Sequence, residues 1–398
     1  MKKLLLLTLS ILMILTAVSC QTAGGPVGTT ENPSTQAPAT TQTPTTEVPT
    51  QEYEDPSYPL TETTLNVAEH TSDVFRTLGR TYVKDNLLNV DFACGGIHFV
   101  TYCEGDIKVQ INSAKDTRFT IYVDGERSNL RLQVTSSNSG QYFTIARNLP
   151  RGEHEIRLIS QTQFIWTYGS IESVKIKGVF LEKPADRELY LEFYGDSILN
   201  GSNVLLAGGG INASDATQAF GFVTAEMMNA DMALIGCSSI GLTTNSRSFV
   251  MKDIWNYAGA RYSAFSTSKT EYLLPGIPEW DFARIPSAII IEQGVNDGSN
   301  ASSKAFEDAV KEMVTNLRAK YGKDVPIVFP TGYCNGTYNS YLPIIVNSLG
   351  GEEANLYVCK LSNASVSKTD GGDGTHPGVE TSKKMAEELS AFLATIIK

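Results

Sequence analysis

The hydrophobic pattern of the chain changes at Pro184, and this change limits the folds that are open to it. Between residues 62 and 185, short runs such as NLLNVDFA, DIKVQINSA and RFTIYVDGE alternate apolar and polar residues, without helical periodicity. Asp124-Gly125 and Pro150-Arg151-Gly152 supply turn chemistry between such runs. Alternating runs joined by tight turns predict an antiparallel β-sandwich over residues 62–185, and a jelly roll is the version that we expect.

After Pro184, strand-like runs alternate with helix-like runs. LYLEFYG, MALIGC, SAIIIEQG, PIVFP and NLYVCKL read as strands, and helices are expected near 218–229, over 301–320 and after Pro377. This alternation predicts a doubly wound, flavodoxin-like three-layer α/β/α domain over residues 186–398, with a mostly parallel sheet of about five strands. Two of the helices carry a single apolar stripe to lay on the sheet, formed by Phe306, Val310, Met313, Leu317 and Tyr321, and by Met385, Leu389, Leu393 and Ile396.

The first 61 residues are expected to contain a secretion signal and a linker. Met1-Lys2-Lys3 precedes an apolar run that is too short to cross a membrane, as in a signal peptide. Ala17-Val18-Ser19-Cys20 resembles the lipobox of bacterial lipoproteins, so residues 1–20 are expected to be a lipoprotein signal peptide with a lipid on Cys20. Residues 21–61 are rich in Thr, Pro and Gln and are expected to be a disordered linker. We therefore expect a protein anchored to the membrane at a bacterial cell surface, and ordinary secretion is the alternative.

Charge and cysteine content exclude some classes of partner. The net charge of −11 argues against a nucleic-acid partner, which would need a basic surface. The remaining cysteines form no CxxC pair and have no metal-ligand spacing, so buried thiols are expected at Cys94, Cys103, Cys237, Cys334 and Cys359. A continuous strand between Cys94 and Cys103 would hold them beyond disulfide distance.

A serine follows the first expected strand of the α/β domain. Gly195-Asp196-Ser197 stands at the edge where sites form in doubly wound sheets. A serine hydroxyl needs a base to become a nucleophile, and of the four histidines only His376 lies in this domain. Asp373, three residues upstream, could bring its carboxylate to Nδ1 and leave Nε2 for the serine proton. A surface histidine beside a helix start is the alternative for His376.

Two more strand ends carry groups that suit an oxyanion. Gly241 in GCSSIGLTTN could offer its backbone N–H, and Asn296 in EQGVNDGSN its side-chain amide. Taken singly, they could be an ordinary turn glycine and a capping asparagine. Ser, Gly, Asn and Asp-x-x-His on one face of a sheet form a more specific set, which favours acyl transfer.

These motifs carry a family resemblance. GDSI, the glycine before LTT, GVND and DGTHP resemble the four blocks of the SGNH, or GDSL-type, hydrolases over residues 187–398. The preceding sandwich and the EFYGDSI junction are similar to carbohydrate esterase family two, acetyl esterases of plant polysaccharides with an N-terminal jelly roll. The resemblance implies Ser197 as nucleophile, His376 as base, Asp373 as its orienting group, no metal or cofactor, and an oxyanion hole from Ser197, Gly241 and Asn296. Ser239 departs from the pattern, since many relatives have glycine there.

The expected function is an extracellular serine esterase that removes O-acetyl groups from acetylated xylan, glucomannan or their oligosaccharides through an acyl-enzyme. One alternative is an SGNH esterase for other acyl esters, such as O-acetylated cell-wall glycan or lipids. Another is a surface carbohydrate-binding protein with an inactive hydrolase scaffold. Trp255 and Trp280 are candidate sugar platforms, with core packing as the alternative. Cys334 in GYCNG fits a G-x-nucleophile-x-G elbow, but that choice leaves the Ser, Gly and Asn motifs unexplained.

Overall fold

The computed structural model describes residues 57–113, 115–206, 208–243, 249–262, 276–298, 302–333, 338, 340–361 and 373–397. The chain divides into two units, Met1–Asp55 and Pro56–Lys398, and all described residues lie in the second. The expected signal peptide, the lipid site at Cys20, linker residues 21–56 and Cys334 lie outside the described residues. Within those ranges, no helix is both long enough and apolar enough to span a membrane.

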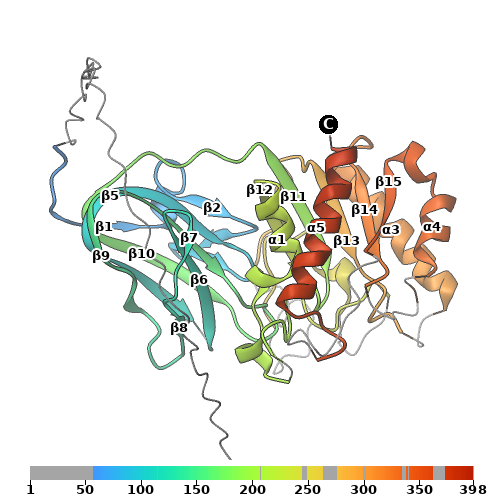
Figure 1. Cartoon of the computed structure of the whole chain (residues 1–398), viewed down its shortest axis with the longest axis horizontal. Helices are drawn as coiled ribbons and strands as arrows, with labels where there is room; N and C mark the ends of the chain where they lie inside the picture. Colours follow the sequence, from blue (N-terminus) through green and yellow to red (C-terminus); the bar gives the residue numbers. More distant parts are fainter. Residues whose placement is uncertain are drawn as a thin grey trace, which may run out of the picture. The chain divides into compact units, whose positions relative to one another are not determined.

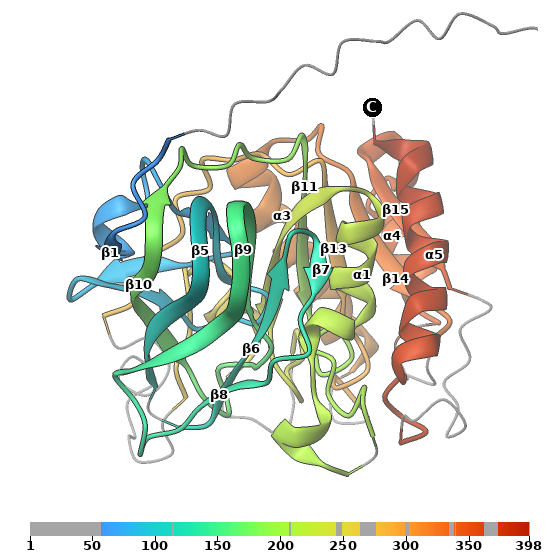
Figure 2. The same cartoon turned by 60° about the vertical axis from the view of Figure 1, so that its left-hand side comes forward.

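The first part of the described chain is an antiparallel sheet that curls on itself (Figure 1). Its main path of neighbouring strands is β3-β4-β10-β5-β9-β6-β7, and Figure 2 shows β10, β5 and β9 side by side. Register shifts along the β5·β9 and β10·β5 pairs mark bulges, which let these long strands bend. The predicted jelly-roll-like sandwich is confirmed. Its strands are β1 (Glu62–Asn66), β2 (Arg76–Leu78), β3 (Tyr82–Lys84), β4 (Leu87–Val90), β5 (Gly96–Ser113), β6 (Thr117–Val123), β7 (Glu126–Arg127), β8 (Leu132–Val134), β9 (Gln141–Ser160) and β10 (Gly169–Phe180).

The second part is a parallel sheet covered by helices on both faces (Figure 1). The strand order β12-β11-β13-β14-β15 corresponds to 2-1-3-4-5, so the predicted doubly wound, flavodoxin-like α/β fold is confirmed. The strands are β11 (Leu189–Gly195), β12 (Ala230–Gly236), β13 (Ala288–Glu292), β14 (Ile327–Thr331) and β15 (Leu356–Lys360). The helices are α1 (Phe220–Met227), α3 (Ser303–Tyr321), α4 (Leu342–Ser348) and α5 (Val379–Ile396).

Alternate residues of β11 enter two different cores. Leu191 and Phe193 pack with apolar residues of α1 and α5, whereas Tyr190 and Tyr194 pack with those of α3 and α4. The strand is therefore buried on both faces, as its nearly continuous apolar sequence indicates. The apolar stripe predicted for α3 is buried along its whole length, and α5 buries all of its stripe except Ile396, which packs at the margin of the core.

A buried ion pair joins the sandwich to the parallel sheet. Arg80, between β2 and β3, places Nη2 at 2.9 Å from Glu192 Oε1 on β11, and both side chains are 0% exposed. The hydroxyls of Tyr190 and Tyr194 each donate to the Glu192 carboxylate at 2.9 Å. Arg80 Nη1 also donates to the carbonyl oxygen of Trp255 at 2.6 Å. These hydrogen bonds offset the large cost of taking two charges out of water.

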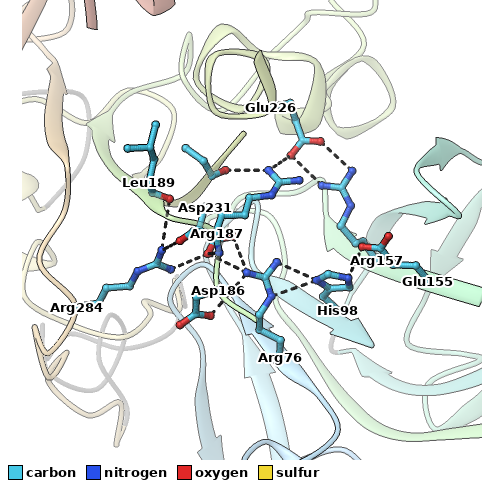
Figure 3. Close-up of polar contacts among 11 residues, drawn as sticks. Arg76, His98, Glu155, Arg157, Asp186, Arg187, Leu189, Glu226, Asp231 and Arg284 are labelled. Atoms are coloured by element: carbon cyan, nitrogen blue, oxygen red, sulfur yellow. Dashed lines mark hydrogen bonds and ion pairs between the residues drawn. The ribbon is translucent and has the colours of Figure 1, made fainter. Parts of the chain in front are cut away.

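A second network of charges crosses the same boundary at the amino ends of β11 and β12 (Figure 3). The Asp231 carboxylate accepts from Arg76 of β2 at 2.8 Å and from Arg284 at 2.7 Å. Arg157 of β9 makes two bonds of 2.8 Å to the Glu226 carboxylate at the end of α1. The network lines a cavity of about 220 Å³. Paired charges thus connect the sandwich to the α/β part at both places.

We predict that Arg80→Met lowers the free energy of unfolding by about 3–5 kcal/mol, because it leaves the buried Glu192 carboxylate without a counterion. Urea unfolding measures the change. Lys304→Ala is the control, since it breaks an exposed pair with Asp308 on α3 and should leave the unfolding midpoint unchanged. Equal midpoints for the two variants would show that the buried pair contributes no more than the exposed one.

Candidate active site

Ser197 stands two residues beyond the end of β11, at the point where the strand order reverses. Gly195 pairs with Gly236 of β12 on one side and with Glu292 of β13 on the other, so Ser197 follows a strand that lies at this switch point. A Cβ on Gly195 would lie 2.7 Å from both Glu292 Oε2 and Leu199 Cδ2, so a side chain does not fit there. Hydrogen-bonded turns follow Ser197.

The structure brings the three predicted catalytic side chains together. His376 Nε2 lies 2.9 Å from Ser197 Oγ, and His376 Nδ1 lies 2.8 Å from Asp373 Oδ2. Asp373 and His376 come from the loop before α5, and Ser197 from the loop after β11, 179 positions away from His376. With its Nδ1–H donated to the carboxylate, the imidazole presents the Nε2 lone pair to the hydroxyl. This geometry suits activation of a serine nucleophile.

Asp373 is held in place by its surroundings. Its Oδ1 accepts from the backbone N–H groups of Thr375 at 2.8 Å and His376 at 2.7 Å, and its Oδ2 accepts from Asn203 Nδ2 at 2.9 Å. Partial burial raises the pKa of Asp373, but hydrogen bonds from the backbone and ring of His376, from Asn203 and from Thr375 outweigh it and lower the pKa well below its usual range. The carboxylate therefore stays ionised across the pH range of an ordinary assay. Sequence reasoning missed Asn203, which sits in a left-handed turn with φ of 55°.

Asn296 is oriented by the aspartate next to the nucleophile. Its Nδ2 donates to Asp196 Oδ2 at 2.6 Å, which leaves the second amide hydrogen for an oxyanion. Asp196 Oδ1 accepts from the Ile198 N–H at 2.9 Å, and the Asp196 N–H donates to Glu292 Oε2 at 3.0 Å. Asp196 and Glu292 are both 0% exposed. Burial raises the pKa of Asp196 to about 6 and that of Glu292 well above its usual value.

The two backbone donors expected for the oxyanion hole are available. Among the described residues, neither the Ser197 N–H nor the Gly241 N–H has a hydrogen-bond acceptor. The carbonyl of Gly241 accepts from the Met251 N–H at 2.9 Å, which fixes the peptide after it. Ser239 has φ of 65°, in the left-handed region that glycine adopts more easily. The serine is therefore a strained choice in the turn that presents Gly241.

A side chain from the sandwich links the two turns that carry these groups. Gln163, which follows β9 and is 1% exposed, accepts from the Ser238 N–H at 2.5 Å. Its Nε2 donates to Ser238 Oγ at 2.8 Å and to Ser202 Oγ at 3.2 Å. The Ser202 N–H in turn donates to the carbonyl of Ser197 at 2.9 Å. Gln163 thus positions the turn after the nucleophile against the turn before Gly241, and sequence analysis had no signal for this contact.

Neither candidate sugar platform lies at this site. Trp255 is only 8% exposed and packs in the core with its ring 5.6 Å from that of Phe282. Trp280 stacks on the guanidinium of Arg80 at 5.4 Å and lines the cavity beside Tyr190, at the amino end of β11. A strand of this length separates that end from Ser197 by about 20 Å. Core packing, the alternative given for these residues, describes the surroundings of Trp255, and Trp280 lies at the opposite end of β11 from Ser197.

The remaining histidines and the described cysteines have places outside this site. His70, His98 and His154 lie in the sandwich, each beside an acidic side chain: Asp73, Glu155 and Asp124 respectively. Cys94, Cys103, Cys237 and Cys359 are buried free thiols, as expected from their spacing.

Comparison with known proteins identifies the family. Residues 191–389 match the family model described as GDSL-like Lipase/Acylhydrolase. The chain belongs to this family. That membership confirms the resemblance noted in the sequence and agrees with the predicted class, a carboxylic ester hydrolase.

Individual relatives of this GDSL-like chain are carbohydrate esterases. The Cellulase/esterase CelE of Acetivibrio thermocellus is 26% identical over 306 residues, which cover 72% of this chain and 35% of that protein. The chain thus spans about a third of the length of this relative. An acetyl xylan esterase (Est2A) from Butyrivibrio proteoclasticus has a similar structure, with 19% identity, a TM-score of 0.72, and coverage of 84% of this chain and 98% of that one. A family two carbohydrate esterase from Clostridium thermocellum, in complex with cellohexaose, gives 22% identity, a TM-score of 0.70, and coverage of 81% and 98%.

We predict that Asp196→Asn lowers kcat by about 10- to 100-fold, because Asn296 loses the charged acceptor that orients its amide. The folded pKa of Asp196, about 6, lies above its unfolded value, so the wild type loses stability as pH rises from about 4 to about 6. Asp196→Asn does not lose stability in this way. The free energy of unfolding of the variant minus that of the wild type should therefore rise between about pH 4 and about pH 6 and stay constant above about pH 6.

Urea unfolding at several pH values, with kcat measured on 4-nitrophenyl acetate, checks both parts. Asp281→Asn is the control, because Asp281 is exposed and lines the cavity at the amino ends of β11 and β12. It should change neither kcat nor the pH dependence of the free energy of unfolding. A pH-independent stability difference for Asp196→Asn would contradict the assigned ionisation, and an unchanged kcat would contradict the role in orienting Asn296.

Proposed function

We propose that this chain is a serine carbohydrate esterase that removes O-acetyl groups from plant hemicellulose, such as acetylated xylan or glucomannan. The observation that carries the proposal is the arrangement of Ser197, His376 and Asp373, with contacts of 2.9 and 2.8 Å. The substrate class is supported by the relatives, which are named as carbohydrate esterases and include an acetyl xylan esterase. Three oxyanion donors at the same strand ends suit an acyl carbonyl.

In the first half of the reaction, Ser197 Oγ attacks the acetyl carbonyl carbon while His376 Nε2 takes the hydroxyl proton. Asp373 stabilises the imidazolium through Nδ1–H. The carbonyl oxygen becomes an oxyanion that accepts from the N–H groups of Ser197 and Gly241 and from the free amide hydrogen of Asn296. When the intermediate collapses, the bond from carbon to the sugar oxygen breaks, and His376 returns the proton to that oxygen. The sugar leaves with a free hydroxyl, and the acetyl group remains on Ser197.

In the second half, water attacks the acetyl-serine. His376 removes a proton from the water, the same donors bind the second oxyanion, and the proton returns to Ser197 Oγ as acetate leaves. The net reaction consumes one water and yields one acetic acid for each ester. Every proton is handled by a single imidazole, which is why its orientation by Asp373 matters in both halves.

We predict that Ser197→Ala and His376→Ala each lower kcat by about 10⁴-fold or more on acetylated xylan, acetylated glucomannan and 4-nitrophenyl acetate. Asp373→Asn should lose about 10²- to 10⁴-fold, since the ring loses the acceptor that fixes its tautomer. Acetate release measures the activity on the polymers. His154→Ala in the sandwich is the matched histidine control and should retain full activity.

The outcomes separate the chemistry from the substrate. Hydrolysis of 4-nitrophenyl acetate without acetate release from either polymer would refute the hemicellulose assignment and direct the search to O-acetylated cell-wall glycans or lipids. An active Ser197→Ala variant would refute the catalytic assignment itself. An inert wild type that still binds polysaccharide would favour a carbohydrate-binding protein.

We also propose that the protein is exported and anchored to a bacterial cell surface by a lipid on Cys20. The support is the basic, apolar amino terminus that ends in Ala17-Val18-Ser19-Cys20, followed by a Thr- and Pro-rich linker. We predict that Cys20→Ser abolishes incorporation of a labelled fatty acid and moves activity from the membrane fraction to the soluble fraction. Unchanged labelling of the variant would rule out this site.

A further inference from the structure

A groove lies between the sandwich and the segment that follows the nucleophile. Its volume is about 640 Å³. One wall comes from β6, β8 and the residues between them, and the other from residues before α1, namely Leu205, Leu206, Asn212, Asp215 and Gln218. The two walls are joined by a hydrogen bond of 2.9 Å between Thr120 and Thr217 and by the ion pair of Arg127 with Asp215 at 2.6 Å. The groove is therefore a built feature of the boundary.

The segment that forms one wall also supports the catalytic aspartate. Asn203 donates to Asp373, and Leu205 and Leu206 line the groove only two and three residues later. Both leucines are unusually open for their type, at 39% and 51% exposure. A chain bound in the groove would thus contact the same segment that orients the triad.

Within the described ranges, two cations in the groove have no carboxylate partner. There Arg118 contacts only neutral oxygens, the carbonyl of Ile211 at 3.5 Å and the side chains of Gln133 and Asn212, and its Nε is buried without a hydrogen bond. Arg131 is exposed, and its side chain forms no ion pair or hydrogen bond within the described residues.

In the described part of the chain, the acidic residues in and beside the groove do not pair with these cations. Asp215, which lines the groove, is paired with Arg127, and Asp116, which lies outside the lining, contacts Gln133 rather than Arg118. A chain with a net charge of −11 therefore keeps two uncompensated guanidinium groups in one hollow. A guanidinium recognises a carboxylate through paired N–H donors, which a neutral sugar does not offer.

We propose that this groove binds a uronic-acid-bearing stretch of the glycan, with sugar carboxylates at Arg118 and Arg131. The proposal rests on the glycan substrate class given above and adds an acidic character to it. The amides of Asn129, Gln161 and Gln218 also line the groove and suit sugar hydroxyls, and the exposed leucines suit the apolar face of a sugar ring. The esterase would then act preferentially on acetyl groups near acidic side groups of the polymer.

Binding measured without catalysis tests the proposal. The Ser197→Ala protein is run by affinity electrophoresis in gels that contain deacetylated glucuronoxylan or the same polymer after chemical reduction of its carboxyl groups. We expect the dissociation constant to rise about five- to tenfold when the carboxyl groups are reduced, and the difference to shrink at high salt. Arg131→Gln in the same background should bind the acidic polymer as weakly as the unmodified groove binds the reduced one.

Arg147→Gln is the matched control, because Arg147 is an exposed arginine on β9 that has no side-chain partner among the described residues and does not line the groove. It should bind like the parent, and the Arg131→Glu reversal should bind more weakly than Arg131→Gln. Equal binding of the acidic and reduced polymers, or equal losses at positions 131 and 147, would overturn the proposal. Acetate release by the wild type is measured separately. A protein without esterase activity would therefore be distinguished from one whose groove does not bind an acidic glycan.

Discussion

The buried pair of Arg80 and Glu192 is the constraint on which the arrangement of the site depends. Glu192 lies in the middle of β11, whose carboxyl end carries Ser197, and Arg80 comes from the sandwich. A fully buried guanidinium cannot slide without leaving a charge unpaired, so the sandwich has a fixed position against the strand that presents the nucleophile. The sandwich is then part of the catalytic scaffold. Because the sandwich is fixed in this way, Gln163, which follows β9, can donate to both Ser202 and Ser238.

Polar groups below the nucleophile serve a similar purpose. Asp196 and Glu292 lie side by side without exposure, and burial, together with the neighbouring Asp196 carboxylate, raises the pKa of Glu292 well above its usual value. Asp196, whose pKa is raised to about 6, carries a negative charge above that pH and faces the Asn296 amide. An apolar pair would be more stable but could not orient that amide. The buried acidic pair therefore lowers the stability of the fold but holds an oxyanion donor, the Asn296 amide, in a fixed orientation.

The sequence predicted those parts of the molecule that local pattern determines. Period-two runs before Pro184 and alternating strands and helices after it were enough for both folds, since each element signals its own buried face. Ser197, Asp373 and His376 were predictable because short motifs at strand ends carry them. Asn203 and Gln163 were not, because their partners lie 170 and 75 positions away and no periodic pattern connects them. The surroundings of Trp255 and Trp280 could not be predicted, because tertiary packing sets the course of a long insertion.

The same reasoning explains why the acidic overall charge misleads about the groove. A net charge of −11 describes the whole chain, whereas recognition depends on the charges that face one hollow. Most arginines at the boundary are consumed by carboxylates, as Arg76, Arg157 and Arg284 are by Asp231 and Glu226. Arg118 and Arg131 differ, because the one carboxylate among the lining residues, that of Asp215, is paired with Arg127, and within the described residues Arg118 donates to a carbonyl and to amide side chains. Because neither arginine has a carboxylate partner among the described residues, a ligand carboxylate displaces water and, at Arg118, only neutral hydrogen-bond partners, so no protein carboxylate competes with it.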